Sequence, residues 1–403
     1  MMKVLFFLSL FLLLASPTWA WDFCAPNADG IMLYYNMVDE DEGACEVAQN
    51  EGVVWDCRVL RIPETLILNR GNRDFGDPDT ICTVIGIGDH AFYSRYKPLD
   101  PDKDYEPTSL FEHVMLPKTI SYIDDYAFYG CLWLSVLDFP EGNEWLRHIG
   151  ESAFAWAGPT RLTIPKTLET LSPHAFEYSG VTYLEFEKGN TSLTKIPDYC
   201  FRGTTVKEIK FSPEIKTIGK YAFAECTLLN SPKLPYGLEI LEKCAFWRHS
   251  YWESFEIPAT IVDIGEYAFC YVQLSDGMPK GPARLSIKNL YVNKATTPYC
   301  ISEKSLGDNE YGYNINNYTR LIKDTNLIVP LGCIDEYATT WPWDRFDRSC
   351  IMARDLSGIK PAKVKTSQPE GVFSLDGRRL AKPQKGLNII RYKDGTAKKV
   401  LMK

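Results

Sequence analysis

The sequence contains few of the groups from which enzymes build active sites. Its 403 residues include only five histidines, and no H-E-x-x-H or Ser-His-Asp arrangement is visible. No cysteine pair has C-x-x-C spacing, so neither a zinc site nor a thioredoxin-type redox site is indicated. Carboxylate pairs are common in so acidic a chain, and glycosidases need only two, but no shared pocket is evident. The sequence therefore predicts a protein that is not an enzyme and that uses no cofactor.

Long apolar runs are missing after the N-terminus. Residues 4–15 are apolar, follow Lys3 and precede small residues that end at Ala20, which predicts a secretory signal peptide over residues 1–20. This stretch is shorter than the roughly 20 residues that a membrane span needs, and no later segment comes closer. We expect an exported chain without a transmembrane segment.

Charge is distributed unevenly along the chain. The formal net charge is −8, yet residues 360–403 alone carry 12 basic and 3 acidic side chains, which leaves a net charge of −17 on the rest. An acidic body argues against nucleic acid as a partner, because phosphate binding needs a basic face. The acidic body and the basic tail are predicted to have separate roles.

One phrase returns eight times: an aliphatic residue followed five positions later by phenylalanine, usually as I-G-x-x-A-F. The gaps between these phenylalanines are 36, 26, 22, 25, 22, 23 and 23 residues. A period of 22–26 residues lies in the range of leucine-rich repeats. Small alanine beside large phenylalanine would let the rings of successive units stack in the interior. The predicted repeat core is Phe92, Phe128, Phe154, Phe176, Phe201, Phe223, Phe246 and Phe269.

Between the phenylalanines, each unit has a short stretch with apolar residues at every second position. Residues 161–165 (RLTIP) and 254–258 (SFEIP) are examples, and this alternation predicts half-buried strands that pair in parallel from unit to unit. A turn with a second aliphatic residue follows, as in residues 167–171. We expect a β-rich leucine-rich-repeat solenoid of about eight units of 22–26 residues, one of them stretched by an insertion.

The repeat register also interprets the histidines and cysteines. His90 and His174 lie two residues before their phenylalanines, where other units have Tyr, Ser or Cys, so all five histidines are expected to be structural or solvated. Cysteines that recur near the phenylalanines are expected to be reduced core residues. In an exported protein the better disulfide candidates lie outside the repeats, at Cys24, Cys45, Cys57 and Cys82.

The stretched unit contains a D-x-D-x-D sequence at Asp100, Asp102 and Asp104, which resembles the start of an EF-hand loop. Tyr105 stands where glycine should be, and Phe111 where the closing glutamate should be. A solvated acidic insertion is the preferred interpretation, and calcium binding by the three aspartates is the minor alternative.

The I-G-x-x-A-F units separated by strand-proline phrases resemble the BspA-like leucine-rich repeats of anaerobic gut and oral bacteria. The resemblance implies repeats over residues 85–289, a β-rich N-terminal cap over 21–84, and irregular closing repeats with a C-terminal cap over 290–355. We expect Trp341 and Trp343 in the core of that C-terminal cap, since aromatic residues dominate core burial.

The basic tail, residues 356–403, contains three short β phrases, with Asp376-Gly377 as a hairpin turn. It resembles the C-terminal sorting tails of type IX-like secretion, although it is shorter than the full sorting domains. The alternative is a basic β tail that associates with the envelope through charge.

The family resemblance implies an exported, cell-surface protein that mediates protein-protein binding or adhesion. Host matrix proteins, mucosal glycoproteins and other bacteria are the candidate partners, on the outer-membrane exterior of a Gram-negative-type bacterium. The alternative is a periplasmic or envelope accessory protein that binds a partner from its own cell. Alternate strand residues point outward, which gives as binding-face candidates Tyr183, Glu185, Lys207, Glu208 and Lys210.

Overall fold

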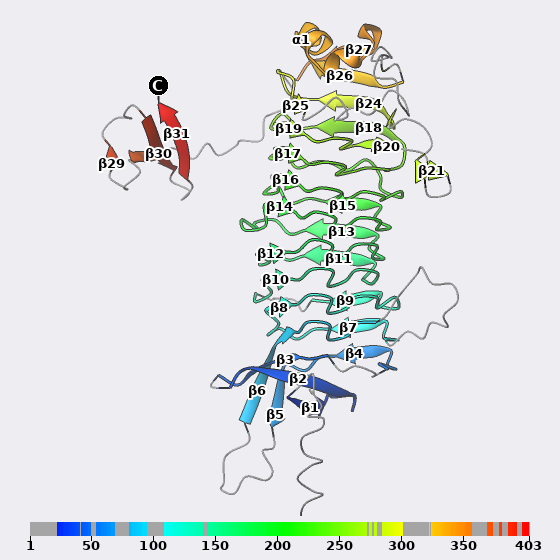
Figure 1. Ribbon diagram of the computed structural model, residues 1–403, viewed down its shortest axis with the longest axis vertical. Helices are drawn as coiled ribbons and strands as arrows, with labels where there is room; N and C mark the ends of the chain where they lie inside the picture. The colour runs from blue at the N-terminus through cyan, green and yellow to red at the C-terminus, as the bar shows by residue number, and fades with distance from the viewer. Residues whose placement is uncertain are drawn as a thin grey trace, which may run out of the picture. The chain divides into compact units, whose positions relative to one another are not determined.

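The computed structural model describes most of the chain. The described residues are 22–40, 42–49, 54–68, 80–94, 109–139, 144–271, 274–275, 278–279, 284–300, 322, 324–356, 369–373, 379–380, 386–392 and 397–402. The chain divides into two compact units, residues 1–356 and 357–403. The regular secondary structure of the first unit is almost wholly β-strand, and Figure 1 shows its coils stacked in a column. The β-rich fold expected from the sequence is confirmed.

One side of the column carries the longer strands of the repeats, here called the first ladder. Its strands pair in parallel, as the sequence predicts. Buried residues alternate with exposed ones along β11 and with half-buried ones along β13, so each strand packs one face on the core. The first ladder consists of β4 (Val59–Arg61), β7 (His113–Met115), β9 (Val136–Asp138), β11 (Arg161–Ile164), β13 (Tyr183–Phe186), β15 (Glu208–Lys210), β18 (Trp252–Ile257), β24 (Ile287–Val292), β26 (Asn326–Pro330) and β27 (Ile351–Arg354).

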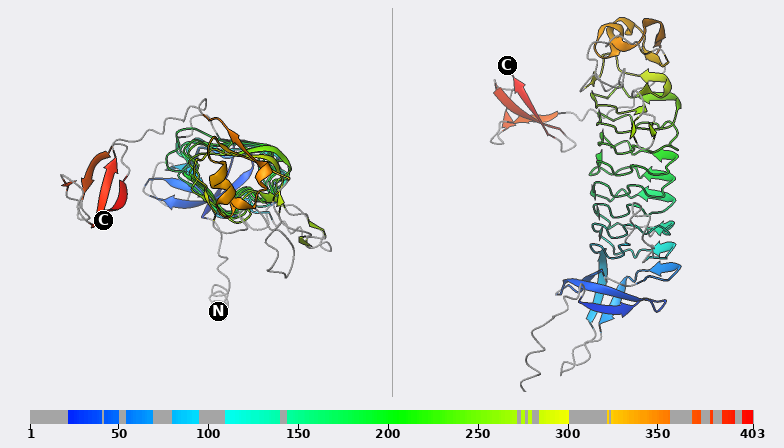
Figure 2. Two further views of the ribbon diagram at one scale, coloured as in Figure 1. Left: turned by 90° about the horizontal axis from the view of Figure 1, so that it is seen from above. Right: turned by 45° about the vertical axis from the view of Figure 1, so that its right-hand side comes forward.

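The opposite side of the column carries a second ladder of mostly two-residue strands, where the sequence predicts turns (Figure 1). These strands also pair in parallel. The second ladder consists of β6 (Thr80–Ile87), β8 (Tyr122–Ile123), β10 (His148–Ile149), β12 (Thr170–Leu171), β14 (Lys195–Ile196), β16 (Thr217–Ile218), β17 (Ile240–Leu241), β19 (Asp263–Ile264) and β25 (Tyr299–Cys300). Seen along the column, successive coils overlie one flattened ring (Figure 2).

The eight repeat phenylalanines lie inside this ring, each at most 1 % exposed. From Phe92 to Phe246, consecutive ring centroids are 5.1–5.4 Å apart. Backbone hydrogen bonds between units hold the same register; for example, the Phe154 N–H donates to the Ala175 carbonyl at 2.7 Å. The residue two positions before each phenylalanine has a left-handed φ of 53–59°.

The N-terminal part of the first unit is a small sheet that continues into the second ladder. Strands β1 (Phe23–Pro26), β2 (Met32–Asp39) and β3 (Ala44–Val47) pair antiparallel in order, β3 then pairs in parallel with β6, and β5 (Thr65–Leu68) pairs antiparallel with β6. None of the twelve cysteines, all of which lie among the described residues, forms a disulfide. The disulfides expected among Cys24, Cys45, Cys57 and Cys82 are therefore not formed; Cys45 and Cys82 are fully buried in the core, whereas Cys24 is exposed.

The C-terminal end of the first unit combines strands with short helices. These are α1 (Ile334–Thr339), η2 (Trp343–Arg345) and η3 (Arg348–Cys350). Trp343 is fully buried, and its Nε1 donates to the Pro298 carbonyl at 3.2 Å. The expectation for Trp341 was wrong: it is 53 % exposed, because the chain turns between α1 and η2 and only the second tryptophan reaches the core.

Smaller pairs and the second unit complete the strands. Strand β20 (Cys270–Tyr271) pairs with β23 (Arg284–Leu285), and β21 (Leu274–Ser275) with β22 (Met278–Pro279). The second unit is an antiparallel sheet in the order β29-β28-β30-β31, formed by β28 (Pro369–Phe373), β29 (Arg379–Leu380), β30 (Gly386–Tyr392) and β31 (Ala397–Met402). Asp376 and Gly377 lie outside the described residues. No helix among the described residues is long and apolar enough to cross a bilayer.

Candidate binding surface

Three of the binding-face residues predicted from the sequence meet on the first ladder. The register places Tyr183 beside Glu208 and Glu185 beside Lys210. The Tyr183 hydroxyl donates to Glu185 Oε2 at 2.8 Å, and Lys210 Nζ lies 3.8 Å from the same oxygen and 5.1 Å from the centre of the Tyr183 ring. The hydrogen bond to Tyr183 and the charge of Glu185 raise the pKa of Lys210. Tyr183, Glu185 and Lys210 thus form one connected group on the surface.

The other two predicted residues extend this group. Glu208 is exposed beside Tyr183, and Lys207 is exposed one residue earlier. Sequence reasoning missed Arg161, whose guanidinium carbon lies 4.2 Å from the centre of the Tyr183 ring. The sequence contained a signal for this residue: Arg161 stands directly before a buried leucine in its strand, and Tyr183 stands at the same position in the next strand. We call Arg161, Tyr183, Glu185, Lys207, Glu208 and Lys210 the strand-face cluster.

A second surface feature, the aromatic corner, lies at the turns that contain the phenylalanines. Here half-buried rings stack directly on the ring of the next unit: His174 on Tyr199 at 4.7 Å and Tyr199 on Tyr221 at 4.9 Å, with interplanar angles of 6° and 7°. The aromatic corner consists of His90, Tyr93, Tyr126, Tyr129, Trp156, His174, Tyr178, Tyr199, Tyr221 and Trp247. The sequence shows that the residue two places before each repeat phenylalanine is often aromatic. It does not show that these rings stack, because stacking depends on the distance between coils.

Arg202 ties the aromatic corner together. Its Nη1 lies 3.3 Å from Glu177 Oε1 and its Nη2 2.9 Å from Glu225 Oε1, while Arg248 Nη1 lies 3.4 Å from the other oxygen of Glu225. The guanidinium of Arg202 also lies 5.4 Å from the centre of the Tyr178 ring. The rings of this surface thus stack on one another, and the charges of Arg202, Glu177 and Glu225 already have partners within the corner.

The comparisons with known proteins agree with the repeat geometry. Residues 102–195 and 194–277 match a family model described as a BspA type leucine rich repeat region, in six copies. The matched segment, residues 102–277, is thus similar to a run of BspA type repeats. None of the curated proteins matches the sequence.

Solved structures similar to this chain include leucine-rich repeat proteins and a vaccine antigen. One is a leucine-rich repeat protein from Bacteroides ovatus, with 16 % identity, 78 % of this chain and 66 % of that chain covered, and a TM-score of 0.39. Another is a leucine rich cell surface protein from Faecalibacterium prausnitzii, with 16 % identity, 68 % and 71 % covered, and a TM-score of 0.37. The pneumococcal vaccine antigen PcpA has 14 % identity, 83 % and 100 % covered, and a TM-score of 0.28.

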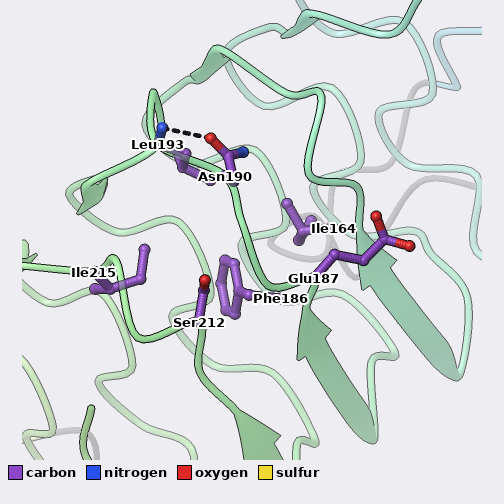
Figure 3. A pocket seen from close by; sticks show the side chains of 7 residues that line it. All are labelled: Ile164, Phe186, Glu187, Asn190, Leu193, Ser212 and Ile215. Carbon is purple, nitrogen blue, oxygen red and sulfur yellow. Dashed lines mark hydrogen bonds between the residues drawn. The ribbon is translucent and has the colours of Figure 1, made fainter. Parts of the chain in front are cut away.

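The repeats also contain a small hollow, shown in Figure 3. Its volume is about 160 Å³, which is below the roughly 300–1,000 Å³ of ligand pockets. Buried Asn190 uses its side chain structurally there, because Oδ1 accepts from the Leu193 N–H at 2.9 Å and Nδ2 donates to the Leu168 carbonyl at 2.6 Å. The hollow is lined by Ile164, Phe186, Glu187, Asn190, Leu193, Ser212 and Ile215. It is too small for an ordinary ligand.

The minor calcium alternative is not addressed by the structure. Asp100, Asp102 and Asp104 lie outside the described residues.

Proposed function

We propose that this protein is exported to the cell surface and binds another macromolecule through its BspA type repeats, with adhesion to host or bacterial macromolecules as the outcome. The observation that carries the proposal is the strand-face cluster, a preorganised group of aromatic and charged side chains on a regular, outward-facing ladder. Solenoids of this kind use extended surfaces rather than deep pockets for binding.

The strand-face cluster is a better binding site than the aromatic corner. In the corner, the guanidinium of Arg202 is already paired with Glu177 and Glu225. On the strand face, by contrast, the exposed side chains of Lys207 and Glu208 have no hydrogen-bond or ion-pair partner within the described part of the chain. Their charges can therefore be used by a partner without breaking an internal contact.

The charges of the cluster favour a protein or glycoprotein partner. Arg161, Lys207 and Lys210 are basic, and Glu185 and Glu208 are acidic, so the surface offers both signs within a few residues of Tyr183. A polypeptide can match such a mixed pattern, whereas nucleic acid requires a basic face. Tyrosine at the centre is typical of the residues that dominate binding energy at interfaces.

Binding to immobilised fibronectin, collagen, mucin and whole bacterial cells tests this assignment. The variant Tyr183→Ala/Lys207→Ala/Glu208→Ala should bind at least about tenfold more weakly, because residues of this kind commonly contribute more than 1–2 kcal/mol at interfaces. The matched control is Lys216→Ala/Glu239→Ala, which removes an exposed ion pair of 3.5 Å on the second ladder. Equal loss in both variants would reject the strand face, and no binding by the unmodified chain would reject adhesion.

Location separates adhesion from the alternative of a periplasmic accessory protein that binds a partner from its own cell. We further propose that the basic tail, residues 356–403, is a sorting signal of the type IX kind. External protease should then remove the full chain from intact cells, while a chain that ends at Leu356 stays protected. Protection of the full chain until the outer membrane is opened would favour the periplasmic alternative.

A further inference from the structure

Two carboxylates and an imidazole converge on the second ladder, away from the strand-face cluster. Asp124 and Asp125 directly follow β8, and His148 begins β10. Parallel pairing places Tyr122 beside His148, so the chain that leaves β8 carries the two aspartates past the imidazole. One nitrogen or oxygen atom of each of the three residues lies within 4.8 Å of the other two, and all three residues are half-buried.

The hydrogen bonds around these residues occupy one atom of each side chain and leave the other without a hydrogen-bond partner in the described part of the chain. His148 Nδ1 lies 2.6 Å from the Thr170 hydroxyl; when Nδ1–H donates to that hydroxyl, Nε2 keeps its lone pair. Metal-binding histidines almost always donate their second N–H in this way. Asp124 Oδ1 accepts from the Asp125 N–H at 2.9 Å, and Asp125 Oδ1 accepts from the Glu151 N–H at 2.6 Å. The second oxygen of each carboxylate remains for a ligand.

The close approach of Asp125 depends on a glycine in the next unit. A Cβ on residue 150 would lie 2.5 Å from Asp125 Oδ1, a distance that real Cβ atoms do not adopt. Gly150 therefore makes room for this carboxylate beside β10.

The same ladder contains an equivalent arrangement in which the protein supplies its own cation. Asp198 Oδ1 lies over Gly219 and accepts from the Lys220 N–H at 3.1 Å, as Asp125 does over Gly150. There Lys195 Nζ lies 3.2 Å from Asp198 and 2.9 Å from Glu242.

The pair next to His148 lacks such a cation. Among the described residues, no lysine or arginine forms an ion pair with Asp124 or Asp125, although the two carboxylates are adjacent in the chain and repel each other. An external cation would supply the charge that Lys195 supplies in the equivalent arrangement.

We propose that Asp124, Asp125 and His148 bind one divalent transition-metal ion, with Zn²⁺ as the preferred ion. An imidazole nitrogen with two carboxylate oxygens suits zinc and its neighbours, whereas Ca²⁺ and Mg²⁺ prefer oxygen ligands alone. Zinc is bound at about 2.0–2.2 Å in tetrahedral sites, so small side-chain rotations must bring the three atoms closer together. Three protein ligands on a half-exposed surface leave the fourth position to water or to a carboxylate of a partner.

Spectroscopic titration of the mature full-length chain tests the site. All proteins carry Cys24→Ser, which removes the exposed thiol, and are treated with chelator. Added Co²⁺ should give a visible absorption spectrum that saturates at one ion per chain and is displaced by Zn²⁺ but not by equimolar Ca²⁺ or Mg²⁺. His148→Ala should abolish the spectrum, and Thr170→Val should weaken binding roughly tenfold, the effect expected for a residue that orients a ligand.

The control is His174→Ala, which removes a histidine held 2.7 Å from Glu177 in the aromatic corner and should leave the titration unchanged. Far-UV circular dichroism of each variant establishes that the fold is retained. A spectrum that persists in folded His148→Ala and in folded Asp124→Asn/Asp125→Asn, or the absence of any saturable Co²⁺ spectrum, would overturn the proposal.

Discussion

Replacement of Phe176 measures how strongly the stack of phenylalanines holds the repeats together. Its ring is fully buried and lies 5.1 Å from Phe154 and 5.4 Å from Phe201, with interplanar angles of 2° and 4°. Phe176→Ala should lower the free energy of unfolding by about 4–5 kcal/mol, the upper part of the range for buried phenylalanine. Phe176→Leu keeps most of the volume but loses two aromatic pairs of roughly 0.5–1.5 kcal/mol each, so a loss of about 1–3 kcal/mol is expected.

A double-mutant cycle separates stacking from simple burial. Phe154→Leu and Phe176→Leu touch in the stack and should couple by about 0.5–1.5 kcal/mol. The control pairs Phe154→Leu with Phe246→Leu, which is four units further along, and should be additive to within about 0.5 kcal/mol. The assay is urea unfolding, followed by both circular dichroism and tryptophan fluorescence because long repeat arrays can lose two-state behaviour. Zero coupling for the adjacent pair, or a loss below about 0.5 kcal/mol for Phe176→Leu, would refute the reasoning.

Two further predictions concern titrating groups. Burial lowers the pKa of His249, an effect that the Ser250 and Phe269 carbonyls facing the ring nitrogens partly oppose. The folded state therefore holds His249 neutral, and only the unfolded state gains the proton below the ordinary pKa of about 6.5. The contribution of His249 to the free energy of unfolding should be fully present above that pH and should decrease as pH falls through it, by up to about 1.4 kcal/mol per pH unit. Urea unfolding midpoints measured from pH 5 to 8 should depend less steeply on pH in His249→Gln. An unchanged slope in this variant would contradict the prediction. Burial also raises the pKa of Cys131 to about 12. At pH 8 without denaturant, Ellman's reagent should therefore label exposed Cys24 first, and Cys24→Ser should remove this fast phase of labelling. Equally fast labelling of Cys131 would contradict its burial.

The sequence predicts the features that repeat with a clear period. The spacing of the phenylalanines and the alternation at residues 161–164 suffice for parallel strands on one side of the column, which the structure confirms. It does not predict the second ladder, because a strand of two residues such as Thr170–Leu171 is too short to show an alternating pattern. Trp341 was misplaced for a related reason: composition identifies an aromatic pair for the cap, but only the turn between α1 and η2 determines which ring is buried.

The surface sites escape sequence analysis for a different reason, since they join residues of different units through the register. Tyr183 and Arg161 are 22 positions apart in the chain, yet their side chains touch because β11 and β13 pair residue for residue. His148 and Asp124 are 24 positions apart, and one polar atom of each comes within 4.8 Å of the other for the same reason. The repeat period predicts which positions of successive units are equivalent. Whether the side chains at these positions touch depends on the coil spacing and the strand register, which only the structure provides.

Residues that depart from the repeat pattern are therefore the first candidates for specific interactions. The position after the aliphatic residue is glycine in several units, and a Cβ at Gly150 or Gly265 would lie 2.5 Å from the backbone of the preceding unit. A residue other than glycine at this position is therefore a departure from the repeat. Glu242 occupies it and binds Lys195 two units away, across Gly219. Asp124 occupies it too and faces His148 instead of a lysine. Glu242 therefore has a cation that the chain itself supplies, at the residue that begins β14. Asp124 has an imidazole instead, at the residue that begins β10, and it is there that we propose an external cation binds.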